Sequence, residues 1–318
     1  MMQKSKKSNF HIKYKADYVN LFVSLLFFLL SIYTVLFFSA KISEDVRRGL
    51  SFCYTVIIPS VFPFMIVSDF IENFVHFERI GFLRRVFSKL FKVNGYAISA
   101  LVCGILCGFP MGVKISKELY VSGKISKKEC ERLIGFSNNA SPAFVISGIG
   151  VGLFSSFKLG VFLYLISIFS SMATGIFFSL SSKSEKESEI KKAASFSFTK
   201  SIKNASLSTL NICGFICFFS VLIGFLERLI KETWLIATLS SFLEIGNAGK
   251  IIAESQELPI EFRIALLAFS ISFSGLSVHM QSKSFLLDTD ISMSKYYIMK
   301  LFSGAISFII TSIFLFFI

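Results

Sequence analysis

The chain has 318 residues, of which 53% are hydrophobic, and its formal net charge is +13. Its mean hydropathy of +0.69 is too high for a soluble domain of this size, and apolar runs of about twenty residues match the bilayer core as helices. They are too long for the alternating strands of an outer-membrane barrel. The basic residues gather in loops and form no nucleic-acid-binding stripe. We therefore expect an all-α polytopic membrane protein that contacts the lipid bilayer and no nucleic acid.

The chain opens with a basic arm, residues 1–17, which precedes an apolar run at 18–40. That run is too long for the apolar region of a signal peptide, and no small-residue cleavage pattern closes it. We expect a cytoplasmic arm followed by a retained transmembrane anchor, because positive charge stays on the cytoplasmic side of a membrane.

Residues 50–181 contain a span bent by prolines, a short apolar run, a broken run and an unbroken span. In order, these segments are 50–71, 95–113, 133–154 and 159–180. The short run ends at Gly108 and Pro110, where a helix cannot continue because proline lacks a donor and glycine is entropically unfavourable. Polar residues and a proline at 138–142 break the third run. We interpret 50–181 as a first structural repeat.

A polar stretch at 182–203 reads as a cytoplasmic linker, and residues 204–318 then repeat the same order of segments. These are a whole span, a short run, a broken run and a whole span, at 205–226, 234–243, 264–287 and 296–318. The short run ends in a glycine-rich break at 244–250, and the broken run is interrupted at 272–277. The second half is therefore a second repeat with the architecture of the first.

The distribution of positive charge predicts how the segments cross the membrane. If the two short runs are re-entrant hairpins, the chain makes about seven crossings and most of its 33 Lys and Arg residues fall on the cytoplasmic side, including the loop 79–92. The halves then enter from opposite sides, as in the inverted repeats of secondary transporters. If both short runs crossed fully, the basic region 114–132 would lie outside, which the charge rule disfavours.

The broken helices are the candidate solute site, because unpaired backbone in a membrane persists only against protein or beside a wet cavity. Half-helix N-termini favour anions, so we expect a small anionic solute. Lys114 and Lys250 follow breaks directly, where each binds the anion or extends to the membrane interface. The predicted substrate-binding residues are Gly108, Pro110, Lys114, Asn138, Asn139, Ser141, Glu244, Asn247, Lys250, Ser274, Gly275, Ser277 and Gln281.

The polar side chains at 138–141 have two readings, as ligand contacts or as caps of the two half-helices. Glu244 is costly inside a membrane and either carries a coupling proton or pairs with Lys250. His279 is either a proton carrier or a structural side chain.

No chemistry of an enzyme is evident in the sequence. It has three His residues and no Ser/His/Asp or His-Glu-x-x-His arrangement. Cys103 and Cys107, like Cys213 and Cys217, are spaced i,i+4 in apolar runs without a convergent His, which favours packing over metal binding. We expect no catalytic residues, no metal and no cofactor.

Motifs at the breaks resemble a known family. These motifs are Cys107–Lys114, Gly123–Ser126 with Glu129, Asn138–Phe144, Phe242–Ile245 with Asn247, and Phe273–Ser277 with Gln281. Together they are similar to the YlbJ (SpoVV) family of sporulation integral membrane proteins, from about Ser51 to the C-terminus.

The resemblance implies a nucleoside-recognition (Gate) fold, similar in plan to concentrative nucleoside transporters. It further implies a role in moving dipicolinate, a small aromatic dianion, across the outer forespore membrane. Two alternatives stay open, a non-transporting scaffold of a spore-assembly complex and a nucleoside-type transporter. The coupling ion or proton and any self-association into oligomers also stay open.

Overall fold

The computed structural model describes residues 37–74, 80–180, 182 and 197–317, and every regular element in these ranges is helical. The basic arm, most of the predicted anchor and most of the linker fall outside the described residues. Within these described ranges, five helices are long and apolar enough to cross a membrane, or six if one sharply bent pair counts as a span. The predicted all-α polytopic membrane protein is confirmed.

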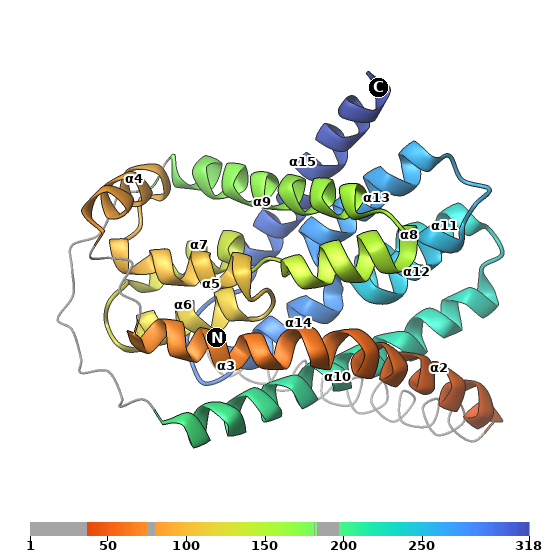
Figure 1. The fold of residues 1–318 in the computed structure, drawn as a ribbon, viewed down its shortest axis with the longest axis horizontal. Coiled ribbons are helices and arrows are strands. Elements are labelled where there is room, and N and C mark those ends of the chain that lie inside the picture. Colours follow the sequence, from red (N-terminus) through yellow and green to blue (C-terminus); the bar gives the residue numbers. More distant parts are fainter. Residues whose placement is uncertain (1–36, 75–79, 181, 183–196, 318) are drawn as a thin grey trace, which may run out of the picture. The chain divides into compact units, whose positions relative to one another are not determined.

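The chain divides into two compact units at Arg47 and Arg48. The described residues of the first unit include the start of helix α2, and the helices after α2 belong to the second unit. The first half of the fold consists of α2 (Ser39–Phe52), the π-helical η1 (Cys53–Ile57), α3 (Ile58–Phe74), α4 (Gly81–Phe91), the 3-10 helix η3 (Gly95–Ala97), α5 (Ile98–Leu106), α6 (Met111–Val121), α7 (Lys127–Ser137), the π-helical η4 (Ala143–Val151), α8 (Gly152–Phe154) and α9 (Phe157–Ser179) (Figure 1).

The second half has the same order of segments as the first, with fewer additional short helices. It consists of α10 (Phe198–Leu229), α11 (Thr233–Leu243), α12 (Ile245–Glu254), α13 (Ile260–Phe273), α14 (Gly275–Phe285) and α15 (Ser294–Phe316). The short helices pack side by side as hairpins, α5 with α6 and α11 with α12. The broken spans are α7 with η4 and α13 with α14. The predicted sequence of whole, short, broken and whole segments is therefore present in both halves.

Corresponding helices of the two halves run antiparallel, as the first and last contacts between α2–α3 and α10 show. Near one end, Arg48 Nη1 lies 2.7 Å from Glu227 Oε2. Near the other, Thr209 Oγ1 lies 3.8 Å from the sulfur of Met65. Residue numbers rise along one helix while they fall along the other.

The same relation holds between α9 and α15, which are the closing helices of the halves. The rings of Phe162 and Phe314 stack with centroids 4.9 Å apart, and those of Phe177 and Phe302 stack at the same separation. Two pairs of corresponding helices are thus antiparallel, which is the geometry that an inverted repeat requires.

Each half also supplies packing surfaces to the other. Helix α7 packs against α15 and α13 packs against α9, while α14 contacts α6 and α12 contacts α8. After Lys300, the buried face of α15 is made of small side chains, which let helices approach closely in a membrane. These are Ser303, Gly304, Ser307 and Thr311. The region between the halves is therefore formed by helices of both repeats and not by one repeat alone.

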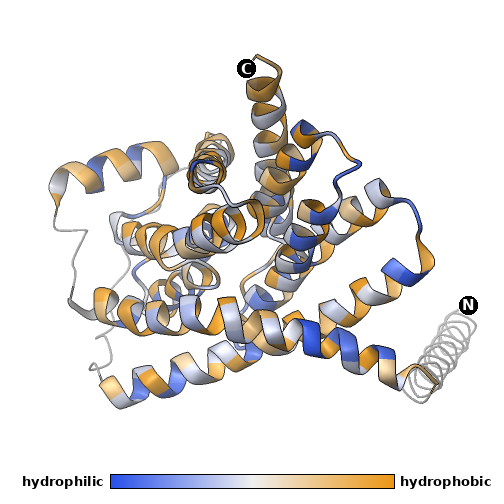
Figure 2. Cartoon of the chain, turned by 45° about the vertical axis from the view of Figure 1, so that its right-hand side comes forward, coloured by the Kyte–Doolittle hydropathy of each residue, from blue (hydrophilic) through white to orange (hydrophobic). Residues whose placement is uncertain are grey.

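The predicted cytoplasmic loop at 79–92 is instead mostly helical, because α4 occupies Gly81–Phe91. It meets the segment Gly95–Leu106 at 98°. Phe87 and Phe91 are buried, whereas Phe82 is exposed, and basic and apolar side chains alternate along the helix (Figure 2). A short amphipathic helix turned across the bundle is typical of a membrane interface.

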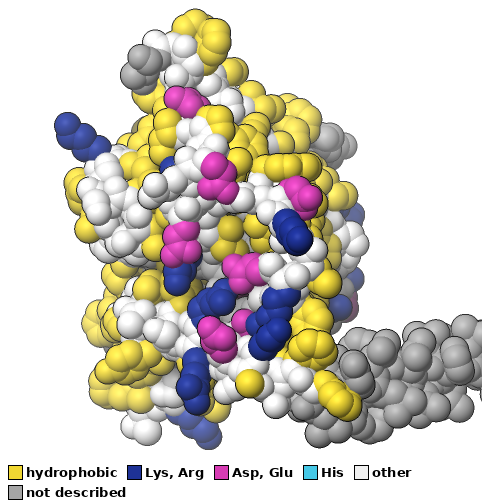
Figure 3. Space-filling model, turned by 90° about the vertical axis from the view of Figure 1, so that its right-hand side faces the viewer, with side chains coloured by type: hydrophobic (Ala, Val, Ile, Leu, Met, Phe, Trp, Pro, Cys, Tyr) yellow, Lys and Arg dark blue, Asp and Glu magenta, His cyan; other side chains and the backbone are white. Residues whose placement is uncertain are grey.

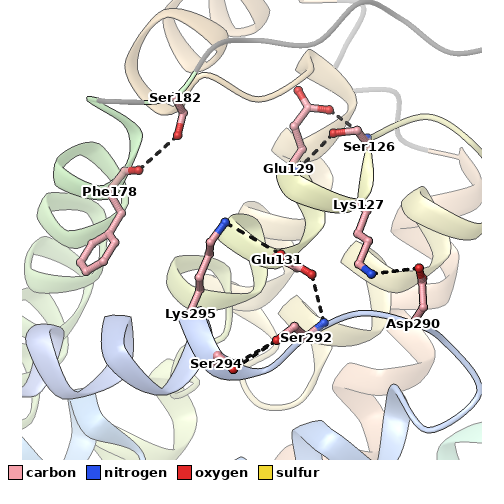
Figure 4. A network of polar contacts seen from close by, with 10 residues as sticks. All are labelled: Ser126, Lys127, Glu129, Glu131, Phe178, Ser182, Asp290, Ser292, Ser294 and Lys295. Carbon is pink, nitrogen blue, oxygen red and sulfur yellow. Dashed lines mark hydrogen bonds and ion pairs between the residues drawn. The ribbon is translucent and has the colours of Figure 1, made fainter.

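A polar layer joins the loop after α14 to the start of α7 (Figure 4). Lys127 Nζ lies 3.0 Å from an oxygen of Asp290. Glu131 accepts a hydrogen bond from the backbone N–H of Ser292 at 3.1 Å, and its other oxygen lies 3.9 Å from Lys295 Nζ. Charged side chains thus connect the second half to the first outside the apolar spans.

The acidic residues of this loop have lowered pKa values because cations face them. Lys117 donates hydrogen bonds to both oxygens of Asp288, at 2.6 and 2.9 Å, and holds the pKa of that carboxyl below its usual range. Lys127 first, and then the Tyr120 hydroxyl, lower the pKa of Asp290. The loop is therefore held by ionised carboxylates at neutral pH.

Candidate functional site

Each hairpin tip lies directly against the break of its own half. Gly108 has φ +81°, and a Cβ there would sit 2.7 Å from the backbone nitrogen of Ser141. Gly275 has φ +70°, and a Cβ there would sit 3.0 Å from the carbonyl oxygen of Leu243. Only glycine permits both the positive φ and the close backbone approach, so these two predicted residues shape the site without contributing side chains.

The two hairpin tips, the first break and helix α14 of the second broken span surround one central cavity between α3 and α10. Its lining residues are Ile57, Val61, Cys107, Phe109, Ser141, Phe144, Ile212, Ile216, Glu244, Ile245, Val278 and Gln281. Three predicted residues, Ser141, Glu244 and Gln281, supply its polar side chains. The cavity volume is about 40 Å³, which is room for about three water molecules.

Glu244 is the buried carboxylate of this cavity, with 1% of its surface exposed. It caps α12, because its oxygens accept hydrogen bonds from the backbone N–H groups of Gly246 at 2.8 Å and Asn247 at 2.7 Å. The Asn247 side-chain amide adds a third bond at 2.8 Å. The expected pairing of Glu244 with Lys250 is not formed, since Lys250 instead faces Glu254 at 3.8 Å. The half-helix N-terminus is thus occupied by a carboxylate.

Gln281 reaches the cavity from α14, and a neighbouring predicted residue holds it in place. Its amide nitrogen donates to the Ser277 hydroxyl at 3.1 Å. Ser277 is fully buried but is not a lining residue, so it positions Gln281 one turn away. Ser274, at φ +80°, forms the break itself.

Two residues of the first break cap helix ends. Asn139 donates through its amide nitrogen to the carbonyl of Phe136 at 2.9 Å, at the end of α7. The Ser141 hydroxyl accepts a hydrogen bond from the backbone N–H of Phe144 at 3.2 Å. Ser141 therefore has both predicted functions, as a cap and as a polar wall of the cavity.

Asn138 faces away from the central cavity, into a buried polar group. Its amide nitrogen donates to the Ser282 hydroxyl at 2.9 Å and to the Tyr296 hydroxyl at 3.2 Å. Its backbone carbonyl accepts a hydrogen bond from Lys300 Nζ. The structure thus places Asn138 at the contact between the first break and α15.

Lys114 and Pro110 lie beside the hairpin tip and do not line the cavity. Lys114 pairs with Asp69 on α3, and both side chains are mostly buried. Pro110 precedes the first residue of α6, Met111. Direct solute binding by Lys114 stays a prediction, and its observed contact joins the first hairpin to α3.

A larger outer cavity of about 360 Å³ lies next to the central one. It is lined by Arg48, Ser51, Phe52, Thr55, Val56, Phe144, Gly148, Ile149, Gly152, Leu153, Gly246, Asn247 and Lys250, with no acidic side chain among them. Phe144 lines both cavities, and its ring meets that of Phe52 edge-on at 6.2 Å. Figure 3 shows one face of the molecule, where charged side chains gather between apolar surfaces.

Sequence reasoning missed the apolar walls and two cations of this region. The chain has 40 Phe residues, and nothing in the sequence distinguished Phe109 and Phe144 from the others as site residues. Arg48 stood between the predicted anchor at 18–40 and the predicted span at 50–71. Lys300 had a usable signal, since it is a charged residue just inside the last apolar run.

The chain is similar to the sporulation integral membrane protein YlbJ of Bacillus subtilis (strain 168). The two sequences are 27% identical over 333 aligned positions, which cover 90% of this chain and 80% of YlbJ. No family model matches the chain, and no solved structure is significantly similar to it. The resemblance first seen in the motifs is thereby confirmed over most of the chain.

Proposed function

We propose that this chain is a sporulation membrane protein. It is a homologue of YlbJ, and this homology supports its assignment to that family of sporulation integral membrane proteins. We further propose that it moves a small organic anion, dipicolinate, across the outer forespore membrane. The function rests on one observation above all, the convergence of both hairpin tips, the first break and helix α14 on a single cavity.

That convergence favours transport over a purely structural role. Secondary transporters bind solutes between discontinuous helices of inverted repeats, and they alternate access around that point. A scaffold has no need for Ser141, Glu244 and Gln281 to meet in the middle of an apolar bundle, where each polar group is costly to bury. The antiparallel pairing of α3 with α10 and of α9 with α15 supports the same plan.

The outer cavity supports an anionic solute. Arg48 and Lys250 both line it, and no carboxylate does. Its volume falls within the range of about 300–1,000 Å³ that is typical of small-molecule sites. Each cation also faces a carboxylate outside the lining, Glu227 for Arg48 and Glu254 for Lys250. A dianion would thus meet two paired cations in a space large enough to hold it.

The central cavity is too small for a solute in this structure, so passage requires movement. A space of about 40 Å³ is far below the size of a ligand site. Phe144 belongs to both cavities, and Phe52 packs against it. Rotation of this aromatic pair, together with movement of the hairpin tips, would join the two spaces, as the opening of a lid does in enzymes.

The test is solute flux in vesicles that contain the purified full chain. Dipicolinate uptake is followed beside that of uridine and succinate. Gln281→Leu is expected to lower dipicolinate flux about tenfold or more, because it removes hydrogen bonds of the central cavity. Lys250→Gln is expected to lower it about two- to fivefold, since its charge is partly exposed. Lys158→Gln, an exposed charge elsewhere, is the matched control and should leave flux unchanged.

The outcomes separate the alternatives. Uptake of uridine without dipicolinate would assign a nucleoside-type transporter. No uptake of any solute by correctly folded protein would assign the scaffold. Equal dipicolinate flux in the wild type and in Gln281→Leu would contradict the placement of the site.

A further inference from the structure

Lys300 on α15 is a fully buried cation beside the first break. Only 1% of its surface is exposed, and its Nζ donates a hydrogen bond to the backbone carbonyl of Asn138. The Phe109 ring lies with its centroid 5.7 Å from Nζ. Within the described ranges, no carboxylate forms an ion pair with it.

An ammonium in this position needs compensation, because burying an ion without a partner costs several kcal/mol. Three features provide it. The Asn138 carbonyl belongs to the freed backbone just after α7, the C-terminal end of α7 carries a partial negative charge, and the face of Phe109 attracts cations. A carbonyl, a helix C-terminus and an aromatic face together form a site for a monovalent cation, which Lys300 fills.

Asn138 is fixed in the orientation that this site requires. Its amide nitrogen is held by Ser282 and Tyr296. Its amide oxygen is buried and has no hydrogen-bond donor. The residue that presents its carbonyl to Lys300 therefore carries a second, unused oxygen.

The break of the second half is closed in a similar way. The carbonyl of Phe273, at the end of α13, is 2.7 Å from Nε2 of His279. In both halves, a side-chain nitrogen of this chain lies within hydrogen-bond distance of a backbone carbonyl at the end of the first half-helix, where the helix supplies no N–H partner. Half-helix C-termini and unwound carbonyls are where cation-coupled transporters hold their Na⁺.

We propose that the Lys300 ammonium is a tethered cation that takes the place of a mobile monovalent cation at the end of α7. The protein consequently needs no Na⁺ or K⁺ at this position. Removal of the side chain leaves an empty site that binds Na⁺, K⁺ or a small alkylammonium ion. For transport, the inference rests on the proposed function. It predicts that dipicolinate movement does not depend on a Na⁺ gradient.

The first test is thermal unfolding of the full chain in detergent, which requires no solute. Wild type, K300A and K300M are compared in chloride salts of Na⁺, K⁺, propylammonium and the bulky N-methylglucamine at equal ionic strength. The wild-type midpoint is expected to be the same in all four. K300A should unfold at a lower temperature and regain several degrees in at least one small cation, with a gain that rises with the logarithm of its concentration.

K300M and an exposed lysine on the same helix serve as controls. The methionine side chain fills the space without charge, so K300M should be less stable in every salt and show no specific rescue. Lys295→Ala removes a half-exposed ammonium of α15 and should show no cation-specific shift. A K300A midpoint that no small cation raises would overturn the inference.

The wild-type arm keeps the inference testable even if K300A does not fold. A wild-type midpoint raised by Na⁺ above its value in N-methylglucamine would show that a mobile cation is required, and would overturn it. In vesicles, dipicolinate flux that follows an imposed Na⁺ gradient would do the same. If dipicolinate does not move at all, the proposed function fails while the unfolding experiment still decides the role of Lys300.

Discussion

Gly108→Ala is the substitution that most directly tests how the first hairpin is held against the break. Gly108 combines φ +81° with a backbone contact, since an added Cβ would lie 2.7 Å from both the nitrogen and the Cβ of Ser141. A side chain in the left-handed region costs about 1–2 kcal/mol. Overpacking at a closed contact costs about 1–3 kcal/mol more. The free energy of unfolding should therefore fall by about 2–5 kcal/mol.

The assay is unfolding of the purified protein in mild detergent by titration with a denaturing detergent, followed by circular dichroism. Gly214→Ala is the matched control, because Gly214 lies inside α10 and a Cβ there would have nothing within 4 Å. Alanine should stabilise that helix by up to about 1 kcal/mol. If Gly108→Ala were as stable as Gly214→Ala, the inferred contact between hairpin tip and break would be wrong.

Two further predictions concern the cap of α12 and the polar loop. Glu244→Ala should lower the free energy of unfolding by about 0.5–2 kcal/mol through loss of the cap. Glu244→Gln retains an acceptor, so its free energy of unfolding should fall less in the same titration. Equal decreases in the two variants would contradict the capping role. The lowered pKa of Asp290 means that its contacts contribute stability above about pH 4 and lose it as the pH falls through that pKa. Hydrogen exchange at 286–293, corrected for intrinsic rates, should therefore quicken at low pH in the wild type, whereas Asp290→Asn should exchange rapidly at neutral pH already.

Much of the fold follows from local signals. Gly108, Pro110 and the polar residues at 138–142 predicted breaks because their backbone chemistry opposes a continuous helix. A break is present in each predicted range. The glycine-rich stretch 244–250 is nevertheless helical from Ile245, so the break there is Glu244 alone, which caps α12. The loop at 79–92 was misjudged because α4 alternates basic and apolar residues, which in a membrane protein suits a helix at the interface as well as a loop.

The functional residues divide in the same way. Ser141, Glu244 and Gln281 were identified as polar groups in apolar surroundings, and they do meet. Asn139 was expected to contact a ligand, with capping as the alternative, and the structure shows a cap. A side chain at a break has both options, and only its neighbours decide between them.

The sequence by itself determined the membrane class, the repeated order of segments and the presence of four breaks, because hydropathy, glycine and proline act on the residues beside them. Tertiary structure alone decided which breaks face one another, that Glu244 turns to its own helix, and that Lys300 reaches Asn138 from 162 positions away. The reason is physical. Packing between helices that are distant in sequence depends on the shape of every contact along them. The residues beside a position in the sequence therefore do not determine which side chains surround it in the fold.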